Sequence, residues 1–128
     1  MEIIDIKGEK NEFFIPAVNF NAQTGTCEIA GESYLEETFE FYQKLIDWLN
    51  RYMKEVNKPL VFNFKLTYFN TASSKAILEI LRLLKKYNDN GGLVTINWFY
   101  HEWDDDMKME VEDLSLDADV SINLLQFA

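Results

Sequence analysis

The sequence predicts a single α/β domain in which helices pack on a mixed β-sheet. The chain has 128 residues, which is the length of one ordinary domain. Hydrophobic residues make up 48% of it and aromatic residues 15%, enough apolar material to fill a core. Segments with strand-like alternation and segments with helical spacing follow one another along the chain, and this order is typical of strand–helix–strand units.

The first thirty residues are expected to form short strands. Residues 2–7 and 12–20 have strand character, and Pro16 indicates that the second strand is bent or lies at an edge of the sheet. Residues 21–25, NAQTG, form a predicted turn, and residues 26–30 alternate as a strand does. These features predict an antiparallel hairpin at one side of the sheet.

A long helix is predicted next, ending near Val56. Ser33 and Glu36 have the spacing of a capping box, in which the serine side chain would cap the helix. Two neighbouring apolar stripes follow at helical spacing, one formed by Phe39, Tyr42, Ile46, Leu49 and Met53, the other by Phe41, Leu45, Trp48 and Tyr52. We expect this surface to pack against the sheet, and the alternative is that part of it meets a partner. Residues 57–59, NKP, end the helix.

The remaining elements alternate between strand and helix. A strand over 60–69 should turn one set of side chains to one face (Leu60, Phe62, Phe64, Leu66 and Tyr68) and the other set to the opposite face (Val61, Asn63, Lys65, Thr67 and Phe69). A helix over 73–88, a stop at 88–92, a strand over 93–100 and a weaker helix over 104–114 follow, and residues 121–127 suit a short helix or a strand. The order β-β-α-β-α-β-α predicts neighbouring parallel strands with right-handed crossovers.

The charge of the chain narrows the kinds of partner. The formal net charge is −10, which opposes binding to nucleic acid and to anionic membranes and favours a partner with a basic face. The alternative is that this charge only keeps the protein soluble. Cys27 is the one cysteine, so no intramolecular disulfide can form. The N-terminus lacks the pattern of a signal peptide, and no apolar run reaches the roughly 18–20 residues that span a bilayer. These features predict a cytoplasmic protein.

Motifs that would indicate an enzyme or a metal site are missing. One histidine and one cysteine do not make a zinc site, and Asp104–Asp106 suits the first turn of a helix better than a calcium loop. A Ser–His–Asp triad would have to use His101. The spacing of a serine–lysine dyad fails, because Ala72 stands three residues before Lys75. We therefore expect no catalytic residue, no metal and no cofactor.

The stretch YFNTASSKAILEIL, residues 68–81, places three hydroxyl groups where a strand gives way to a helix. One interpretation of Thr71, Ser73 and Ser74 is helix capping, which needs one hydroxyl or two. The other is a phosphorylation switch, because a phosphate at a helix N-terminus meets free N–H groups and the positive end of the helix dipole. Such a phosphate would spare the fold while adding charge and bulk to the surface.

Several motifs together resemble the SiaC-type regulatory phosphoproteins. They are GESY (31–34), a helix with FY and WL (41–42 and 48–49), LTYFNTASSKAILEIL (66–81), and GG followed by INWFY (91–92 and 96–100). The resemblance covers most of the chain, and its most specific part runs from Tyr68 to Lys75. It implies one regulatory domain over residues 1–128, distantly similar to the STAS-type anti-sigma-factor antagonists.

The resemblance also implies roles for the residues around the junction. In the family, the threonine that follows the asparagine is phosphorylated, and this position is Thr71. Asn70 is expected to end the strand, Ser73 to cap the helix, and Tyr68 to pack beside the site or line the interface. Lys75 is expected to shape the site with them. Ala72 stands where the family often has serine, whereas Ser73 is retained. Ser73 and Ser74 remain alternative phosphate acceptors. Ser74 is also expected to contact the partner.

The partners that the resemblance implies are enzymes. A dedicated Ser/Thr protein kinase would add the phosphate and a PP2C-type phosphatase would remove it. The unphosphorylated protein would bind and activate a diguanylate cyclase (a GGDEF protein), promoting c-di-GMP signalling and biofilm formation. Three alternatives stay open: a STAS-like antagonist that binds an anti-sigma kinase, a small hydrolase using Thr71 or Ser73, and a structural domain whose hydroxyls only cap a helix.

Overall fold

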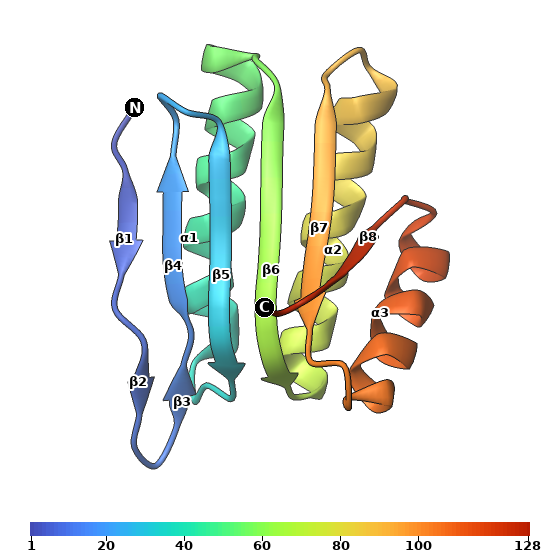
Figure 1. The fold of residues 1–128 in the computed structure, drawn as a ribbon. Coiled ribbons are helices and arrows are strands. Elements are labelled where there is room, and N and C mark those ends of the chain that lie inside the picture. Colours follow the sequence, from blue (N-terminus) through green and yellow to red (C-terminus); the bar gives the residue numbers. More distant parts are fainter.

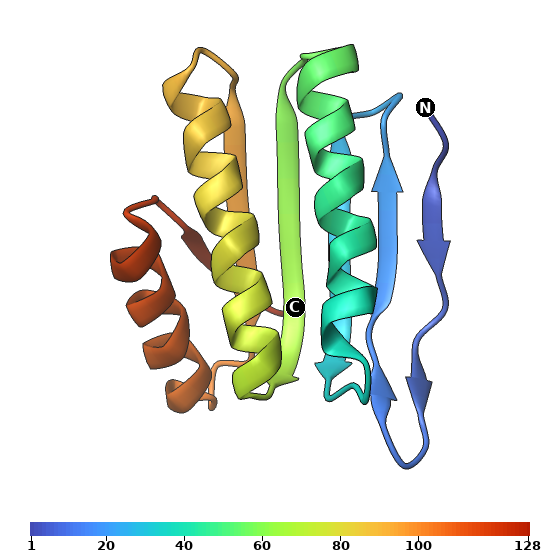
Figure 2. The same cartoon turned by 180° about the vertical axis from the view of Figure 1, so that it is seen from behind.

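The computed structural model describes residues 1–128 and has two layers, a mixed sheet and three helices on one of its faces (Figures 1 and 2). The strands of the sheet lie in the order β1-β4-β5-β6-β7-β8. Their bounds are β1 Ile4–Ile6, β4 Ala17–Asn21, β5 Thr26–Ser33, β6 Leu60–Phe69, β7 Val94–Tyr100 and β8 Asn123–Gln126. The helices are α1 Thr38–Arg51, continued by the π-helical turn η1 Tyr52–Val56, then α2 Thr71–Asp89 and α3 Asp105–Ala118. The prediction of a single α/β domain with a mixed sheet is confirmed.

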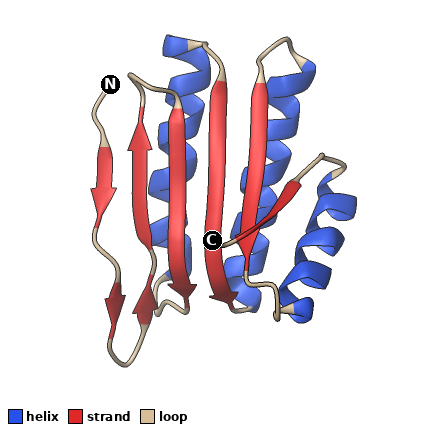
Figure 3. Cartoon of the chain, viewed as in Figure 1, coloured by secondary structure: helices blue, strands red, loops and turns tan.

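The N-terminal strands are antiparallel and the others are parallel. β1 pairs with β4 and β4 with β5 in antiparallel fashion, which confirms the hairpin around residues 21–25. β5 to β8 run parallel, as the crossovers require, and the C-terminal tail is a strand (Figure 3). The predicted strand 12–20 is divided at Pro16, so that β3 (Phe14–Ile15) pairs with β2 (Glu9–Lys10) in a separate small hairpin.

The core lies between the sheet and the helices. Leu60, Phe62, Phe64 and Leu66 of β6 are all buried on this face, and the ring of Phe64 stacks on Trp98 with 4.6 Å between centroids. On the open face, Asn97 donates a hydrogen bond to Asn63 over 2.9 Å. The alternation expected from the sequence therefore holds along most of β6.

The alternation fails at the end of β6, where the sequence prediction for Tyr68 and Phe69 is wrong. Gly31 of β5 pairs with Leu66, but the next residue, Glu32, pairs with Tyr68, so Thr67 is the extra residue of a bulge. The bulge reverses the facing of the residues after it. Phe69 is buried, whereas Tyr68 is 46% exposed.

The start of α1 also differs from the prediction. Ser33 does not cap this helix, because it is the last residue of β5; α1 begins at Thr38, and no side chain caps it. Phe39, which was expected to pack in the first apolar stripe, is 73% exposed, so this part of the prediction is wrong. Leu45 and Trp48 of the second stripe are buried as predicted. None of the three helices combines the length and apolarity that crossing a bilayer requires.

Candidate functional site

The candidate site lies at the edge of the sheet where β5, β6 and β7 end and where all three helices begin, at the bottom of Figure 1. The three strands are parallel neighbours, so their carboxyl ends meet at this edge. Open α/β sheets bind ligands and partners at such edges, because the connecting loops and helix N-termini converge there. The predicted hydroxyl cluster lies in the middle of this edge, at the junction of β6 and α2.

Asn70 is the residue that turns the strand into the helix. Its extended backbone ends β6, and its side-chain oxygen accepts a hydrogen bond of 2.9 Å from the Ser73 N–H. This is N-capping geometry, so the prediction that Ser73 caps α2 is wrong. The helix begins at Thr71, two residues earlier than expected, since Asn70 supplies the cap.

The Ser73 hydroxyl serves a different purpose beneath the surface. Its side chain is fully buried, with its oxygen 2.8 Å from Ser33 Oγ, and it donates to the Ser33 carbonyl oxygen over 3.2 Å. Ser33 Oγ in turn lies 2.7 Å from the Tyr42 hydroxyl. The Asn70 N–H donates to the Ser33 carbonyl oxygen as well, over 3.1 Å. This buried hydroxyl network ties β5, α1 and the first turn of α2 together.

The sequence does not predict the roles of Ser33 and Tyr42 in this network. Ser33 is 40 residues from Ser73, and the local spacing around it resembled a helix cap instead. Tyr42 lies in an apolar stripe, where nothing distinguishes it from a core aromatic residue. Burial raises the pKa of the Tyr42 phenol to about 12, although the neighbouring hydroxyls of Ser33 and Ser73 partly oppose this rise. The phenol is therefore neutral at physiological pH and can donate a hydrogen bond to Ser33.

Thr71 differs from the two serines in accessibility. It is exposed at the first position of α2, whereas Ser73 is buried and Ser74 is half-buried. Helix geometry leaves the N–H groups of the first turn without partners inside the helix, and only those of Ser73 and Ser74 are satisfied by Asn70. A group added to the Thr71 oxygen would project to solvent next to the remaining donors.

The charges around Thr71 suit an anion. Lys75 is exposed, forms no ion pair, and stands four residues after Thr71, which places both on the same side of the helix. The first turn of α2 contains no acidic residue. By contrast, Glu40 stands in the first turn of α1, and Asp105 in that of α3. In a chain of net charge −10, the start of α2 is the helix N-terminus where added negative charge meets least repulsion.

Exposed aromatic side chains surround the hydroxyl cluster. Tyr34 is 42% exposed just after β5, Tyr68 46% at the end of β6, Phe39 73% in the first turn of α1, and Trp103 77% between β7 and α3. These four are all of the strongly exposed aromatic side chains, and each lies at the edge that carries Thr71. Because aromatic residues are enriched at the cores of protein interfaces, this edge has the character of a docking surface. The sequence predicts such a role for Tyr68 alone.

The structure offers no nucleophile–base pair at this edge. The His101 ring stacks on Trp103 with 5.3 Å between centroids and forms no hydrogen bond to Thr71 or Ser73. No group of three or more His, Cys, Asp or Glu side chains is arranged to hold a metal ion. A hydrolase using Thr71 or Ser73 therefore lacks the hydrogen-bonded base that activation of a hydroxyl requires.

Comparison with known proteins assigns the chain to a family. The model of the SiaC family, described as SiaC family regulatory phosphoprotein, matches residues 6–127. The chain belongs to the SiaC family. A protein of Pseudomonas aeruginosa strain UCBPP-PA14 is 35% identical to it over 85 residues, which is 66% of this chain and 68% of that protein.

Solved structures agree with this assignment. SiaC of Pseudomonas aeruginosa has 28% sequence identity and a TM-score of 0.86, with 99% of this chain and 100% of that chain covered. SiaC in the crystal structure of the diguanylate cyclase SiaD in complex with its activator SiaC, also from Pseudomonas aeruginosa, gives 26% identity and a TM-score of 0.85, with 95% and 100% covered. The recognition of a SiaC-type fold from the sequence motifs is confirmed.

Proposed function

We propose that this SiaC-family protein is a partner switch without catalytic activity, controlled by reversible phosphorylation of Thr71. In its unphosphorylated form it binds and activates a diguanylate cyclase, and a Ser/Thr kinase and a PP2C-type phosphatase set the fraction that is modified. Asn70 and Ser73 position Thr71, and Tyr68, Ser74 and Lys75 contact the partner. The observation that carries this proposal is that Thr71 is the one fully exposed hydroxyl among Thr71, Ser73 and Ser74.

The buried hydroxyl network supports a switch that leaves the fold intact. Ser33, Tyr42 and Ser73 hold the start of α2 in place without using the Thr71 hydroxyl. A phosphate on Thr71 adds about −1.5 to −2 charges at pH 7, and the neighbouring N–H groups and Lys75 can compensate part of this charge. The change is therefore confined to the surface, where it adds repulsion and bulk amid the four exposed aromatic residues.

The relative's complex supports a cyclase as the partner class. SiaC of Pseudomonas aeruginosa is the activator of the diguanylate cyclase SiaD, and the present chain shares its fold over 95% of its length. The alternative of an anti-sigma antagonist uses the same phosphorylated edge but a different partner. Affinity capture with the wild-type protein separates the two, because a GGDEF protein supports the proposal and an anti-sigma kinase contradicts it.

Phosphorylation mapping tests the site directly. The purified protein is incubated with its cognate kinase and ATP, and the products are examined by intact-mass and peptide mass spectrometry. We expect one phosphate on Thr71, none on Thr71→Ala, and a phosphate that still lies on Thr71 in the matched control Ser74→Ala. Phosphate on Ser74 in the wild type, or undiminished labelling of Thr71→Ala, would show that the site is assigned wrongly.

A further inference from the structure

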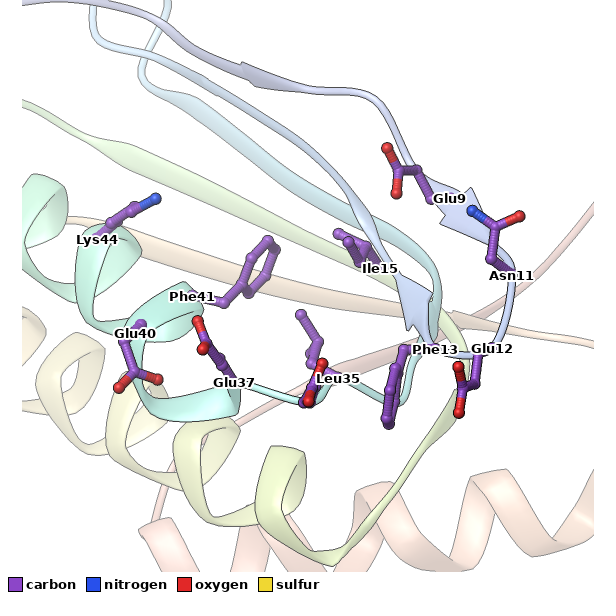
Figure 4. Close-up of a pocket in the computed structure, with 11 residues that line it drawn as sticks. Glu9, Asn11, Glu12, Phe13, Ile15, Leu35, Glu37, Glu40, Phe41 and Lys44 are labelled. Atoms are coloured by element: carbon purple, nitrogen blue, oxygen red, sulfur yellow. The ribbon is translucent and has the colours of Figure 1, made fainter.

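A groove beside the Thr71 edge lies between the small β2–β3 hairpin and the N-terminal half of α1 (Figure 4). Its volume is about 420 Å³, within the usual range of binding pockets. None of the residues that line it belongs to the hydroxyl network or to the Thr71 junction. A ligand of this groove would therefore contact residues other than those of the Thr71 junction, although the groove adjoins Tyr34 through the ring of Phe13.

The floor of the groove is apolar. Ile15 of β3, Leu35 in the segment before α1, and Phe41 of α1 line it, and each of these side chains is half-buried. Figure 4 shows them between the helix and the hairpin. Half-buried apolar side chains on a concave surface gain from burial by a partner, because about 25 cal/mol is gained per Å² of apolar surface removed from water.

The rim of the groove is strongly acidic. Five glutamates and one lysine line it, so the groove carries a large share of the chain's net charge of −10. The acidic residues are Glu9 and Glu12 on the hairpin side and Glu36, Glu37 and Glu40 on the helix side. All five are exposed, and none takes part in a salt bridge or a side-chain hydrogen bond. Their charge is not neutralised within the molecule.

The walls of the groove are held in place by the backbone. The N–H of Phe14 donates to the Tyr34 carbonyl oxygen over 2.8 Å, and the N–H of Tyr34 donates to the Phe14 carbonyl oxygen over 2.9 Å. The rings of Phe13 and Tyr34 also contact each other, with 5.7 Å between centroids. The hairpin is thus fixed to the segment that leads into α1, and the groove exists before any partner binds, which lowers the cost of ordering on binding.

We infer that this groove binds a basic amphipathic segment of a partner protein. Apolar side chains of the segment fill the floor formed by Ile15, Leu35 and Phe41, and its lysine or arginine side chains face the glutamates of the rim. Charge complementarity selects this occupant: the unpaired carboxylates disfavour acidic segments, nucleic acid and anionic membrane surfaces. The apolar floor disfavours a purely basic tail, which would leave these side chains in water.

The inference is tested with synthetic peptides as probes. A fluorescein-labelled peptide with leucine and lysine at helical spacing is titrated with the protein and followed by fluorescence anisotropy. Two control peptides separate the contributions, one with glutamate in place of lysine and one with serine in place of leucine. We expect measurable binding of the leucine–lysine peptide and at least about tenfold weaker binding of both controls, equivalent to about 1.4 kcal/mol.

Matched charge variants locate the binding. The groove variant Glu12→Gln/Glu37→Gln/Glu40→Gln should weaken binding about tenfold, since three rim charges are removed. A control variant that removes the same charge elsewhere, Glu102→Gln/Asp113→Asn/Asp117→Asn, should change the affinity less than about twofold. Circular dichroism establishes that both variants fold. Equal losses of peptide affinity in the two variants would overturn the inference, because the net charge of the protein alone would then explain the binding.

Two further measurements keep this inference separable from the phosphorylation switch. In a two-dimensional NMR titration, which a 15.1 kDa chain allows, the largest shift changes are expected at the backbone amides of Phe13, Leu35 and Phe41. Changes concentrated elsewhere would contradict the assignment. Thr71→Asp is expected to leave the peptide affinity within about twofold of wild type, since Thr71 lies outside the groove. The groove can therefore fail this test while the switch stands, and the reverse.

Discussion

Introducing a carboxylate at Ser73 or at Thr71 should have opposite consequences, although the two residues are only two positions apart. Ser73 is fully buried, and its hydroxyl is held by Ser33. Thr71 is exposed at the first position of α2. Ser73→Asp places a charge inside the hydroxyl network, whereas Thr71→Asp places one in water at the positive end of a helix dipole.

The magnitudes follow from these environments. Ser73→Ala loses two hydrogen bonds, and a net value of about 0.5–1.5 kcal/mol for each gives about 1–3 kcal/mol of lost stability. Ser73→Asp adds the cost of an unpaired buried charge, several kcal/mol, so its total loss should exceed about 4 kcal/mol. Domains of this size are stable by about 5–15 kcal/mol. Thr71→Asp should change stability by less than about 1 kcal/mol and in the favourable direction.

Urea denaturation followed by far-ultraviolet circular dichroism measures these differences. The comparison covers wild type, Thr71→Asp, Ser73→Ala and Ser73→Asp. Their unfolding free energies are compared with the same dependence on urea concentration (the same m value) for all four. We expect the order Thr71→Asp, wild type, Ser73→Ala, Ser73→Asp, from most to least stable. A Ser73→Asp protein within about 1 kcal/mol of wild type would refute the buried network, since an exposed carboxylate costs that little.

Three other predictions concern titratable side chains. Tyr42→Phe should lower the unfolding free energy by about 1 kcal/mol at pH 7. Burial raises the pKa of the Tyr42 phenol from about 10 to about 12, so the stabilisation by this phenol is lost between pH 10 and 12 and the difference between wild type and variant should shrink there. Urea denaturation at several pH values measures this difference, and a difference that stays constant would contradict the prediction. Burial also raises the pKa of the Cys27 thiol, so a disulfide reagent such as DTNB should label the native protein far more slowly than the unfolded one, and equal rates would show an accessible thiol. Burial, and to a smaller extent repulsion from neighbouring aspartates, raises the pKa of the Glu110 carboxyl. Glu110→Gln should therefore raise the melting temperature at pH 7, and the two proteins should melt at the same temperature below the ordinary pKa of glutamate. A lower melting temperature of the variant at pH 7 would contradict this prediction.

The fold could be predicted from the sequence wherever the signal is local. The alternation in residues 60–66 and the helical spacing of residues 77–87 depend on each segment alone, and both predicted elements are present. The bulge at Thr67 could not be predicted, because it arises from how β6 pairs with β5 beyond Gly31. The same limit applies to the C-terminal tail, which becomes a strand because β7 offers it a parallel edge.

The candidate site shows the same division. Thr71 could be placed at the start of a helix from its neighbours and from the family resemblance, and the structure puts it there. The sequence nevertheless predicted that Ser73 caps α2 and that Ser33 caps α1, because a capping motif and a buried hydroxyl look alike in sequence. Only the contact between β5 and α2, across 40 residues, shows that the two serines bond to each other. The acidic groove likewise depends on the hairpin lying beside α1.

The measurement that tests the central claim most directly compares the two forms of the wild-type protein for binding to the cognate diguanylate cyclase. One sample is phosphorylated on Thr71 by the kinase, and a second portion of it is returned to the unmodified form by the phosphatase. The account predicts that the unmodified form binds the cyclase and raises c-di-GMP synthesis, and that the phosphorylated form binds at least about tenfold more weakly. Equal binding and equal activation by the two forms would contradict it.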